Sequence, residues 1–185
     1  SLLNRGCEVY VFPASAPVNE ILGVDPDGIM LSNGPGDPKD CIESIETLKK
    51  LLGKKPIFGI CLGHQLMALA NNADTTKLKY GHRGSNHPVK DLEKDLTYIT
   101  SQNHGYTIVE ESLSKSMEVS HRNMNDGTVE GIKYKDIPVF TVQFHPEASP
   151  GPTDTAYLFD EFIKMMEKYS GENTKGTEEV NNAKA

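Results

Sequence analysis

One short segment, PIFGICLGHQ at residues 56–65, restricts the possible folds of this chain more than any other. An apolar run typical of a buried strand leads into Gly59, Cys61 follows, and Gly63 stands where a helical pattern begins. This is the glycine–X–nucleophile–X–glycine spacing of a tight strand-to-helix turn, which needs glycines because nearby backbone leaves no room for Cβ atoms. The segment therefore predicts an α/β fold that holds Cys61 between a buried strand and a helix.

The remaining pattern agrees with an α/β sandwich that has a mostly parallel central sheet, flanking helices and an antiparallel extension. The start of the chain resembles the end of a helix, so an earlier strand is expected, without which the sheet has an exposed edge. We predict one domain over residues 1–170 and a disordered tail over 171–185. Strands are predicted at 8–12, 28–31, 56–60, 96–100, 117–120, 129–134 and 139–144, and helices at 42–52, at 62–71 and from Thr153 or Asp154 to Gly171.

The composition of the chain indicates which classes of partner and which cellular compartment to expect. The 185 residues carry a net charge of −7, so there is no basic field to attract nucleic acid or an anionic membrane surface. No apolar stretch approaches the roughly 20 residues that span a bilayer. The three cysteines form no CxxC pair, which argues against a disulfide framework and favours a reducing, cytoplasmic setting. We expect a small-molecule substrate, no nucleic acid and no membrane.

The environment of Cys61 favours a nucleophile. A sulfur at the N-terminus of a helix is stabilised as thiolate by the helix dipole, and the amide of Leu62 can donate to an oxyanion in the same space. An isolated cysteine is more often a buried structural residue. That interpretation holds for Cys7 and Cys41, which lack the glycines and the strand-to-helix context.

A thiol nucleophile needs a base, and the base needs a group that orients it. The strand predicted over 139–144 leads directly into His145, Pro146 and Glu147. Pro146 stiffens the turn, His145 can exchange a proton with Cys61, and Glu147 can hold the imidazole. Taken alone, an ordinary surface turn would explain these residues equally well; the turn at Cys61 favours the catalytic interpretation.

The other histidines show no spacing typical of metal ligands, so no metal is predicted. His64 starts the helix after Cys61, and His82 and His87 are assigned to a glycine-rich loop. Two polar loops after strands, residues 32–38 (SNGPGDP) and 102–106 (QNHGY), can offer backbone groups to a ligand. For the first of them an ordinary tight turn is the alternative.

The segments GICLGHQ, SNGPGDP and HPE, in the observed arrangement, resemble a class I glutamine amidotransferase, a family with a flavodoxin-like sandwich fold. GHRGSNHPV at residues 81–89, SQNHGY at 101–106 and HPEASPGPTDT at 145–155 are similar to the amidotransferase domain of the carbamoyl-phosphate synthase small chain. Against this family pattern, the sequence lacks the small chain's N-terminal domain and the first strand of the amidotransferase domain.

The resemblance implies that Cys61 attacks glutamine to form a γ-glutamyl thioester, with His145 and Glu147 completing the triad. Ammonia would pass to the carbamoyl-phosphate synthase large chain, which would hold ATP and Mg²⁺, for arginine or pyrimidine biosynthesis; this chain would hold no cofactor. Service to another synthetase, such as anthranilate synthase, and a non-catalytic docking or regulatory role are the alternatives. By the same resemblance, glutamine and its oxyanion would contact Gly34, Gly36, Leu62, Gln65, Asn103, Gly105 and Tyr106.

Overall fold

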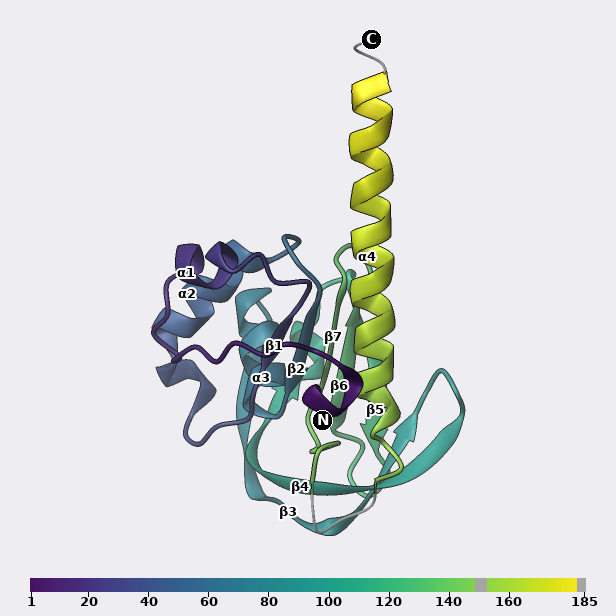
Figure 1. Ribbon diagram of the computed structural model, residues 1–185. Helices are drawn as coiled ribbons and strands as arrows, with labels where there is room; N and C mark the ends of the chain where they lie inside the picture. Colours follow the sequence, from purple (N-terminus) through teal and green to yellow (C-terminus); the bar gives the residue numbers. More distant parts are fainter. Residues whose placement is uncertain (149–152, 183–185) are drawn as a thin grey trace.

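In the computed structural model, which describes residues 1–148 and 153–182, a single mixed sheet forms the centre of the molecule (Figure 1). The described strands follow the order β1-β2-β7-β6-β5-β3-β4. Helices flank the sheet, so the predicted α/β sandwich is confirmed. The strands are β1 (Ile29–Leu31), β2 (Ile57–Ile60), β3 (Asp74–Asp91), β4 (Leu96–Val109), β5 (Met117–Asn123), β6 (Val129–Tyr134) and β7 (Val139–Val142).

The parallel part of the sheet consists of β1, β2 and β7, with β2 in the middle. Every residue of β2 and β7 is buried, as expected for parallel strands covered on both faces. The register places Gly59 beside Leu31 and Ile60 beside Val142, so the carboxyl ends of these strands meet at one edge. This edge is where ligands bind in open α/β sheets.

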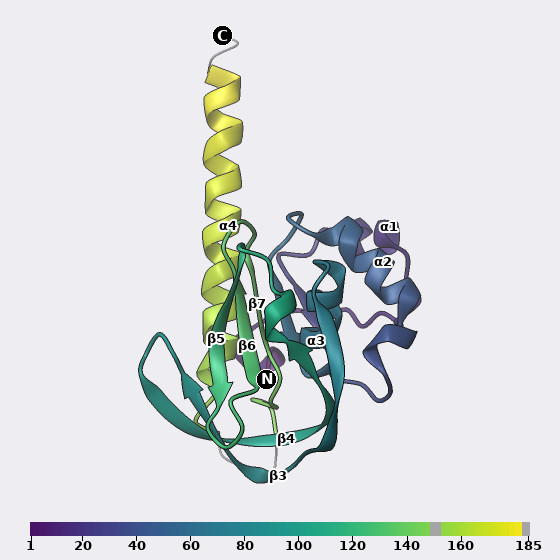
Figure 2. The same ribbon diagram turned by 180° about the vertical axis from the view of Figure 1, so that it is seen from behind.

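The antiparallel extension is the larger part of the described sheet. It runs from β7 through β6 and β5 to the long hairpin of β3 and β4, which curves under the molecule in Figure 2. His82 and His87 lie within β3, and residues 102–106 lie within β4, so the loops predicted there are wrong. The two strands supply each other's backbone partners, and Gly81 (φ +71°) and Gly84 (φ +134°) accommodate register shifts between them.

Hydrophobic clusters cover both faces of the sheet. Side chains alternate along β2, so Ile57 joins the cluster under α2 (Ile42–Leu51) and α3 (Leu62–Ala70). Phe58 faces the opposite way and stacks on Phe140 with ring centroids 4.5 Å apart. The helix α4 (Tyr157–Asn182) covers this second face (Figure 1). The smaller helices are α1 (Val18–Gly23) and the 3₁₀ turns Leu3–Arg5, Pro38–Asp40 and Glu110–Ser112.

Two predictions about the ends of the chain are wrong. Residues 8–12 form no strand, and Val11 is 90% exposed, because no described strand lies beside this segment to pair with its backbone. The helix predicted to end at Gly171 continues to Asn182. Glycine costs a helix only about 1 kcal/mol relative to alanine and keeps its N–H, so it weakens α4 without breaking its hydrogen-bond ladder. Residues 183–185 lie outside the described part.

Of the helices in the described part of the chain, none is both long enough and apolar enough to cross a membrane.

Candidate active site

Cys61 occupies the tight turn between β2 and α3. It is 4% exposed, and its N–H donates to the Val142 carbonyl at 2.9 Å, which fixes the turn to the neighbouring strand β7. Its backbone has φ +53° and ψ −102°, a conformation that residues other than glycine rarely adopt. The strain is held by the packing around the turn and aims the side chain at the carboxyl edge of the sheet, as in other nucleophile turns.

The two glycines that flank Cys61 are required by close backbone contacts. A Cβ atom on Gly59 would lie 2.9 Å from the carbonyl carbon and oxygen of Gly63. A Cβ atom on Gly63 would lie 2.6 Å from both the carbonyl oxygen and the Cβ of Leu31. The glycine–X–cysteine–X–glycine pattern therefore records how closely α3 approaches β2 and β1, as the sequence predicted.

His145 and Glu147 follow β7 at the same edge. The N–H of His145 donates to the Ser101 carbonyl at 2.9 Å, which ties the turn to β4, and the His145 Nδ1 bonds the Glu147 carboxylate at 2.8 Å. The other ring nitrogen, Nε2, is buried and forms no well-aligned hydrogen bond with the described residues. Cys61 nevertheless interacts with the ring. Poor alignment is common for hydrogen bonds of catalytic sites before substrate binds.

The charge state of His145 follows from these neighbours. The Cys61 thiol, followed by the Glu147 carboxylate, raises the pKa of His145 to about 10, against an opposing effect of burial. The imidazolium is therefore the stable form at neutral pH. A protonated His145 between a thiol and a carboxylate is ready to protonate a leaving group.

The loop of residues 32–38 lies against the turn at Cys61. A Cβ atom on Gly34 would lie 2.6 Å from Cδ2 of Leu62, which shows how near the loop comes to the start of α3. Leu62 is the first residue of α3, where backbone N–H groups have no partner within the helix. Gly36 lies in the same loop with φ +99°. The two residues predicted to bind the oxyanion are thus on adjacent segments.

Gln65 and Tyr106 connect α3 to β4 beside the site. The buried Gln65 donates from Nε2 to the Tyr106 carbonyl and to Oε1 of Gln143, each at 2.9 Å. The Tyr106 hydroxyl interacts with Asp37, whose carboxylate raises the pKa of the tyrosine. Both donors of the Gln65 amide are therefore used within the protein, while its Oε1 has no such bond in the described contacts. Asn103, which is exposed, and the half-buried Gly105 lie on the same stretch of β4.

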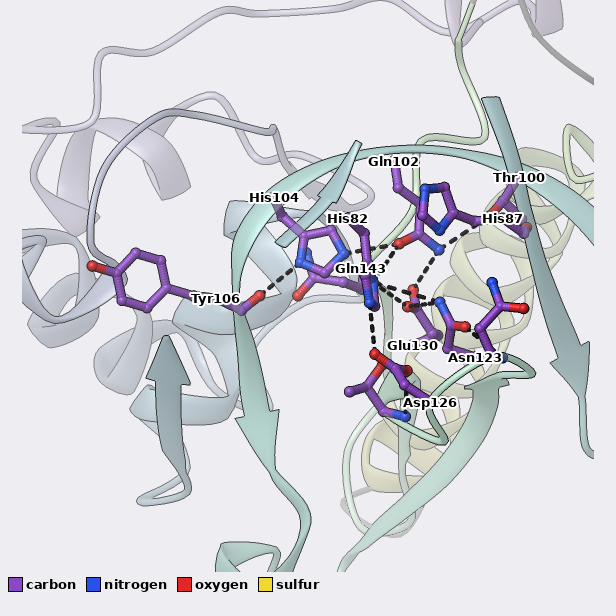
Figure 3. A network of polar contacts seen from close by, with 12 residues as sticks. His82, His87, Thr100, Gln102, His104, Tyr106, Asn123, Asp126, Glu130 and Gln143 are labelled. Carbon is purple, nitrogen blue, oxygen red and sulfur yellow. Dashed lines mark hydrogen bonds and ion pairs between the residues drawn. The ribbon is translucent and has the colours of Figure 1, made fainter. Parts of the chain in front are cut away.

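A buried polar network lies behind this stretch of β4, and sequence reasoning missed it (Figure 3). The hydrogen bonds join β4 to β3, β5 and β6, across distances in sequence that no local motif records. One signal was present, because the polar side chains at 100, 102 and 104 alternate and so share the buried face of β4. The members are His82, His87, Thr100, Gln102, His104, Asn123, Asp126, Glu130 and Gln143.

The histidines of the molecule differ in their charge. The Glu130 carboxylate, helped by Asp126, raises the pKa of His82 to about 9 despite burial. Burial lowers the pKa of His104, and it lowers that of His64 to about 3 and that of His121 to about 4. His64 is fully buried and bonds the Thr141 hydroxyl at 2.7 Å, consistent with a structural role beneath the turn.

The fold and the site together define an α/β protein with a cysteine, a histidine and a glutamate at the carboxyl ends of adjacent parallel strands. The family model "Glutamine amidotransferase class-I" matches residues 1–165, so the chain belongs to the class I glutamine amidotransferase family.

Within this family, the chain is similar to carbamoyl phosphate synthase small chains. The chain is 60% identical over 166 residues to the carbamoyl phosphate synthase small chain of Clostridium acetobutylicum, covering 89% of this chain and 47% of the relative. It is 60% identical over 176 residues to that of Bacillus caldolyticus, covering 95% and 48%. The chain therefore spans about half the length of the curated relatives it matches.

A solved structure is similar in fold. It is the crystal structure of a putative GMP synthase protein from Thermoplasma acidophilum, with a TM-score of 0.80 and 24% identity, over 94% of this chain and 88% of that one.

Proposed function

We propose that the chain hydrolyses glutamine to glutamate and ammonia, with Cys61 as nucleophile, His145 as acid and base, and Glu147 as the group that orients it. The observation that carries the proposal is the position of His145, which interacts with Cys61 on one side and bonds Glu147 on the other. The membership in the amidotransferase family supports the same chemistry.

In the proposed reaction His145 holds the proton of Cys61, so the thiolate sulfur attacks the side-chain amide carbon of glutamine, and the carbonyl electrons move to the oxygen. The amides of Leu62 and Gly36 stabilise this oxyanion. His145 donates its proton to the nitrogen as the carbon–nitrogen bond breaks, so ammonia leaves and a γ-glutamyl thioester remains. Neutral His145 then takes a proton from water, whose oxygen attacks the thioester, and glutamate leaves as Cys61 is restored.

Glutamine is proposed to lie between the loop of residues 32–38 and β4, with contacts from Gly34, Asn103, Gly105 and Tyr106. Gln65 would act mainly by holding the Tyr106 carbonyl and Gln143 in place, because its amide nitrogen is already bonded to both. Its Oε1 can still accept a hydrogen bond from the substrate.

The partner we propose is the large chain of carbamoyl-phosphate synthase, in the cytoplasm, since the similar proteins are small chains of that enzyme. The released ammonia would be used there with ATP and Mg²⁺ to make carbamoyl phosphate for arginine or pyrimidine synthesis. No cofactor takes part in the thioester steps proposed for this chain.

Glutamate release from glutamine, measured with and without that large chain, tests both levels of the proposal. We expect Cys61→Ala to abolish release and Cys7→Ala to leave it unchanged, since Cys7 lies outside the site. Glu147→Ala should slow turnover less than Cys61→Ala, because an orienting group contributes less than the nucleophile. Unchanged turnover in Cys61→Ala would refute the nucleophile, whereas normal turnover without stimulation by the large chain would refute only the partner.

A further inference from the structure

The centre of the buried network brings together three metal-binding side chains from three strands. His82 on β3, His104 on β4 and Glu130 on β6 are all buried, and their ligand atoms lie within 4.8 Å of one another. Gln102 directs its side-chain oxygen into the same space (Figure 3). None of these contacts belongs to the catalytic triad.

Each histidine has one ring nitrogen turned inward and the other bonded to an acceptor outside the cluster. His82 bonds Asp126 through Nε2 at 2.8 Å, and His104 bonds the Tyr106 carbonyl through Nδ1 at 2.7 Å. Histidines that bind metal almost always donate their outer N–H to a carboxylate or a backbone carbonyl, which fixes the ring and its inward lone pair. Both rings of this cluster have that arrangement.

The inward atoms of the cluster can share a cation. A carbonyl only accepts, so Nδ1 of His104 carries a proton, and in the neutral tautomer Nε2 presents a lone pair to Oε1 of Gln102, 2.9 Å away. Rotating the Gln102 amide does not relieve this contact, because its nitrogen donates to Glu130 and an oxygen there would face the carboxylate. In that tautomer two lone pairs face each other, and a cation between them would relieve the contact.

The inward atoms lie close enough together to share one small ion, and the two shortest contacts would widen by a few tenths of an ångström to reach tetrahedral spacing. Oε1 of Gln102 lies 2.9 Å from Nδ1 of His82 and 2.9 Å from Nε2 of His104, and Nδ1 of His82 lies 3.3 Å from Oε1 of Glu130. Ligands about 2.0–2.1 Å from a tetrahedral zinc ion are about 3.3 Å apart. The fully buried Glu130 carboxylate lies 3.3 Å from Nδ1 of His82, and a divalent ion between the two atoms would serve as its positive partner when that nitrogen is a ligand.

We propose that His82, His104 and Glu130, with the side-chain oxygen of Gln102, bind a divalent metal ion of the zinc type. Nitrogen and oxygen ligands of this kind suit zinc and its spectroscopic substitute cobalt. Bound there, the ion joins β3, β4 and β6 and fixes the ring whose Nδ1 holds the Tyr106 carbonyl. Its role is structural, and it takes no part in the chemistry at Cys61.

The test uses the whole chain with Cys61→Ser, so that the thiol beside His145 cannot bind the metal. Equilibrium dialysis against zinc, with elemental analysis, should give one ion per chain, and cobalt should give the intense visible absorption of a tetrahedral site. Glu130→Gln and His104→Gln should lose both signals. The matched control His121→Gln, a buried histidine near Asp91 and outside the cluster, should retain them.

Asp126→Asn keeps the test decisive if a buried variant fails to fold. Asp126 is partly exposed and bonds only the outer nitrogen of His82 among the ligands, so its loss should weaken zinc binding about 10–100-fold. Absence of stoichiometric zinc in the folded Cys61→Ser protein would overturn the proposal. So would undiminished binding in folded Glu130→Gln or His104→Gln, or in Asp126→Asn.

Discussion

At the scale of single residues, His145 shows how neighbours set the state of a catalytic group. One ring nitrogen of His145 bonds Glu147, and the ring also interacts with Cys61. These two neighbours keep the imidazolium stable well above neutral pH. The protonation that the first step needs is thus present before glutamine arrives.

Replacing Glu147 with glutamine should move the alkaline limb of the pH–rate profile. Glu147 raises the pKa of His145, so its neutral replacement lowers that pKa, and His145 loses its proton at lower pH. Activity should therefore decline about one to three pH units earlier than the limb near pH 10 of the parent. The measurement is kcat/KM for glutamate release across pH 6–11.

Glu118→Gln is the matched control, since this exposed carboxylate pairs with Lys135 on the surface. Its profile should coincide with that of the parent. An alkaline limb that stays in place in Glu147→Gln would show that this carboxylate does not set the charge of His145.

The sequence predicted the residues of the proposed triad but not the network behind it. Cys61, His145 and Glu147 each lie in a local motif, and the parallel order of β2 and β7 brings the two motifs together. Glu130 and Gln102 instead meet through bonds between strands that are distant in sequence. Such contacts depend on the register between strands, and single-residue patterns do not specify that register.

At the scale of elements, two opposing effects on stability meet at Gly63, in the turn from β2 to α3: helix propensity and steric contact. Alanine is about 1 kcal/mol better than glycine inside a helix. A Cβ atom at this position, however, would lie 2.6 Å from the carbonyl oxygen and the Cβ of Leu31, which are fixed by the backbone of β1 and cannot move freely. We expect packing to win, because overpacking typically costs about 1–3 kcal/mol.

Gly63→Ala should therefore lower the free energy of unfolding measured with urea, and it should also lower turnover by displacing Cys61. Gly23→Ala in α1 is the control, because an added Cβ atom there meets nothing within 4 Å. An increase in stability for Gly63→Ala would mean that helix propensity outweighs the contact with β1.

The elements that the sequence failed to predict share a physical cause. The pattern of residues 8–12 is typical of a strand, but a strand also needs a neighbour, and β1 is the edge of the described sheet. Residues 74–91 show the converse, since glycines and histidines in a polar stretch form a strand because β4 pairs along most of its length. In both segments the presence or absence of a pairing strand determined the structure. The elements β2, β6 and α2, by contrast, could be predicted from their own side chains.

At the scale of the whole molecule, α4 packs through its first turns. Leu158, Phe159 and Phe162 are each 1% exposed and join the cluster that contains Phe58, and the Tyr169 hydroxyl bonds the carbonyls of residues 53 and 54. These contacts hold the helix to the sheet before Gly171 is reached.

A chain that ends at Gly171 should therefore keep its thermal stability, with a Tm within about 2 °C of the parent by calorimetry. Phe162→Ala provides the contrast, since removing a buried aromatic side chain should cost about 3–5 kcal/mol. A fall in Tm of more than about 5 °C on truncation would show that residues 172–185 contribute to the fold.

The position of β7 has a consequence for how the protein matures. This strand is the last of those that the structure describes, yet it inserts between β2 and β6, so the contact between Cys61 and Val142 closes a loop of about 80 residues. Long-range pairings of this kind form late in folding, because their entropy cost is met only when much of the sheet exists. A ribosome-bound chain that has not yet exposed residues 139–147 carries the thiol without its base. On the proposed function, glutamine hydrolysis therefore begins only after residues 139–147 have been synthesised.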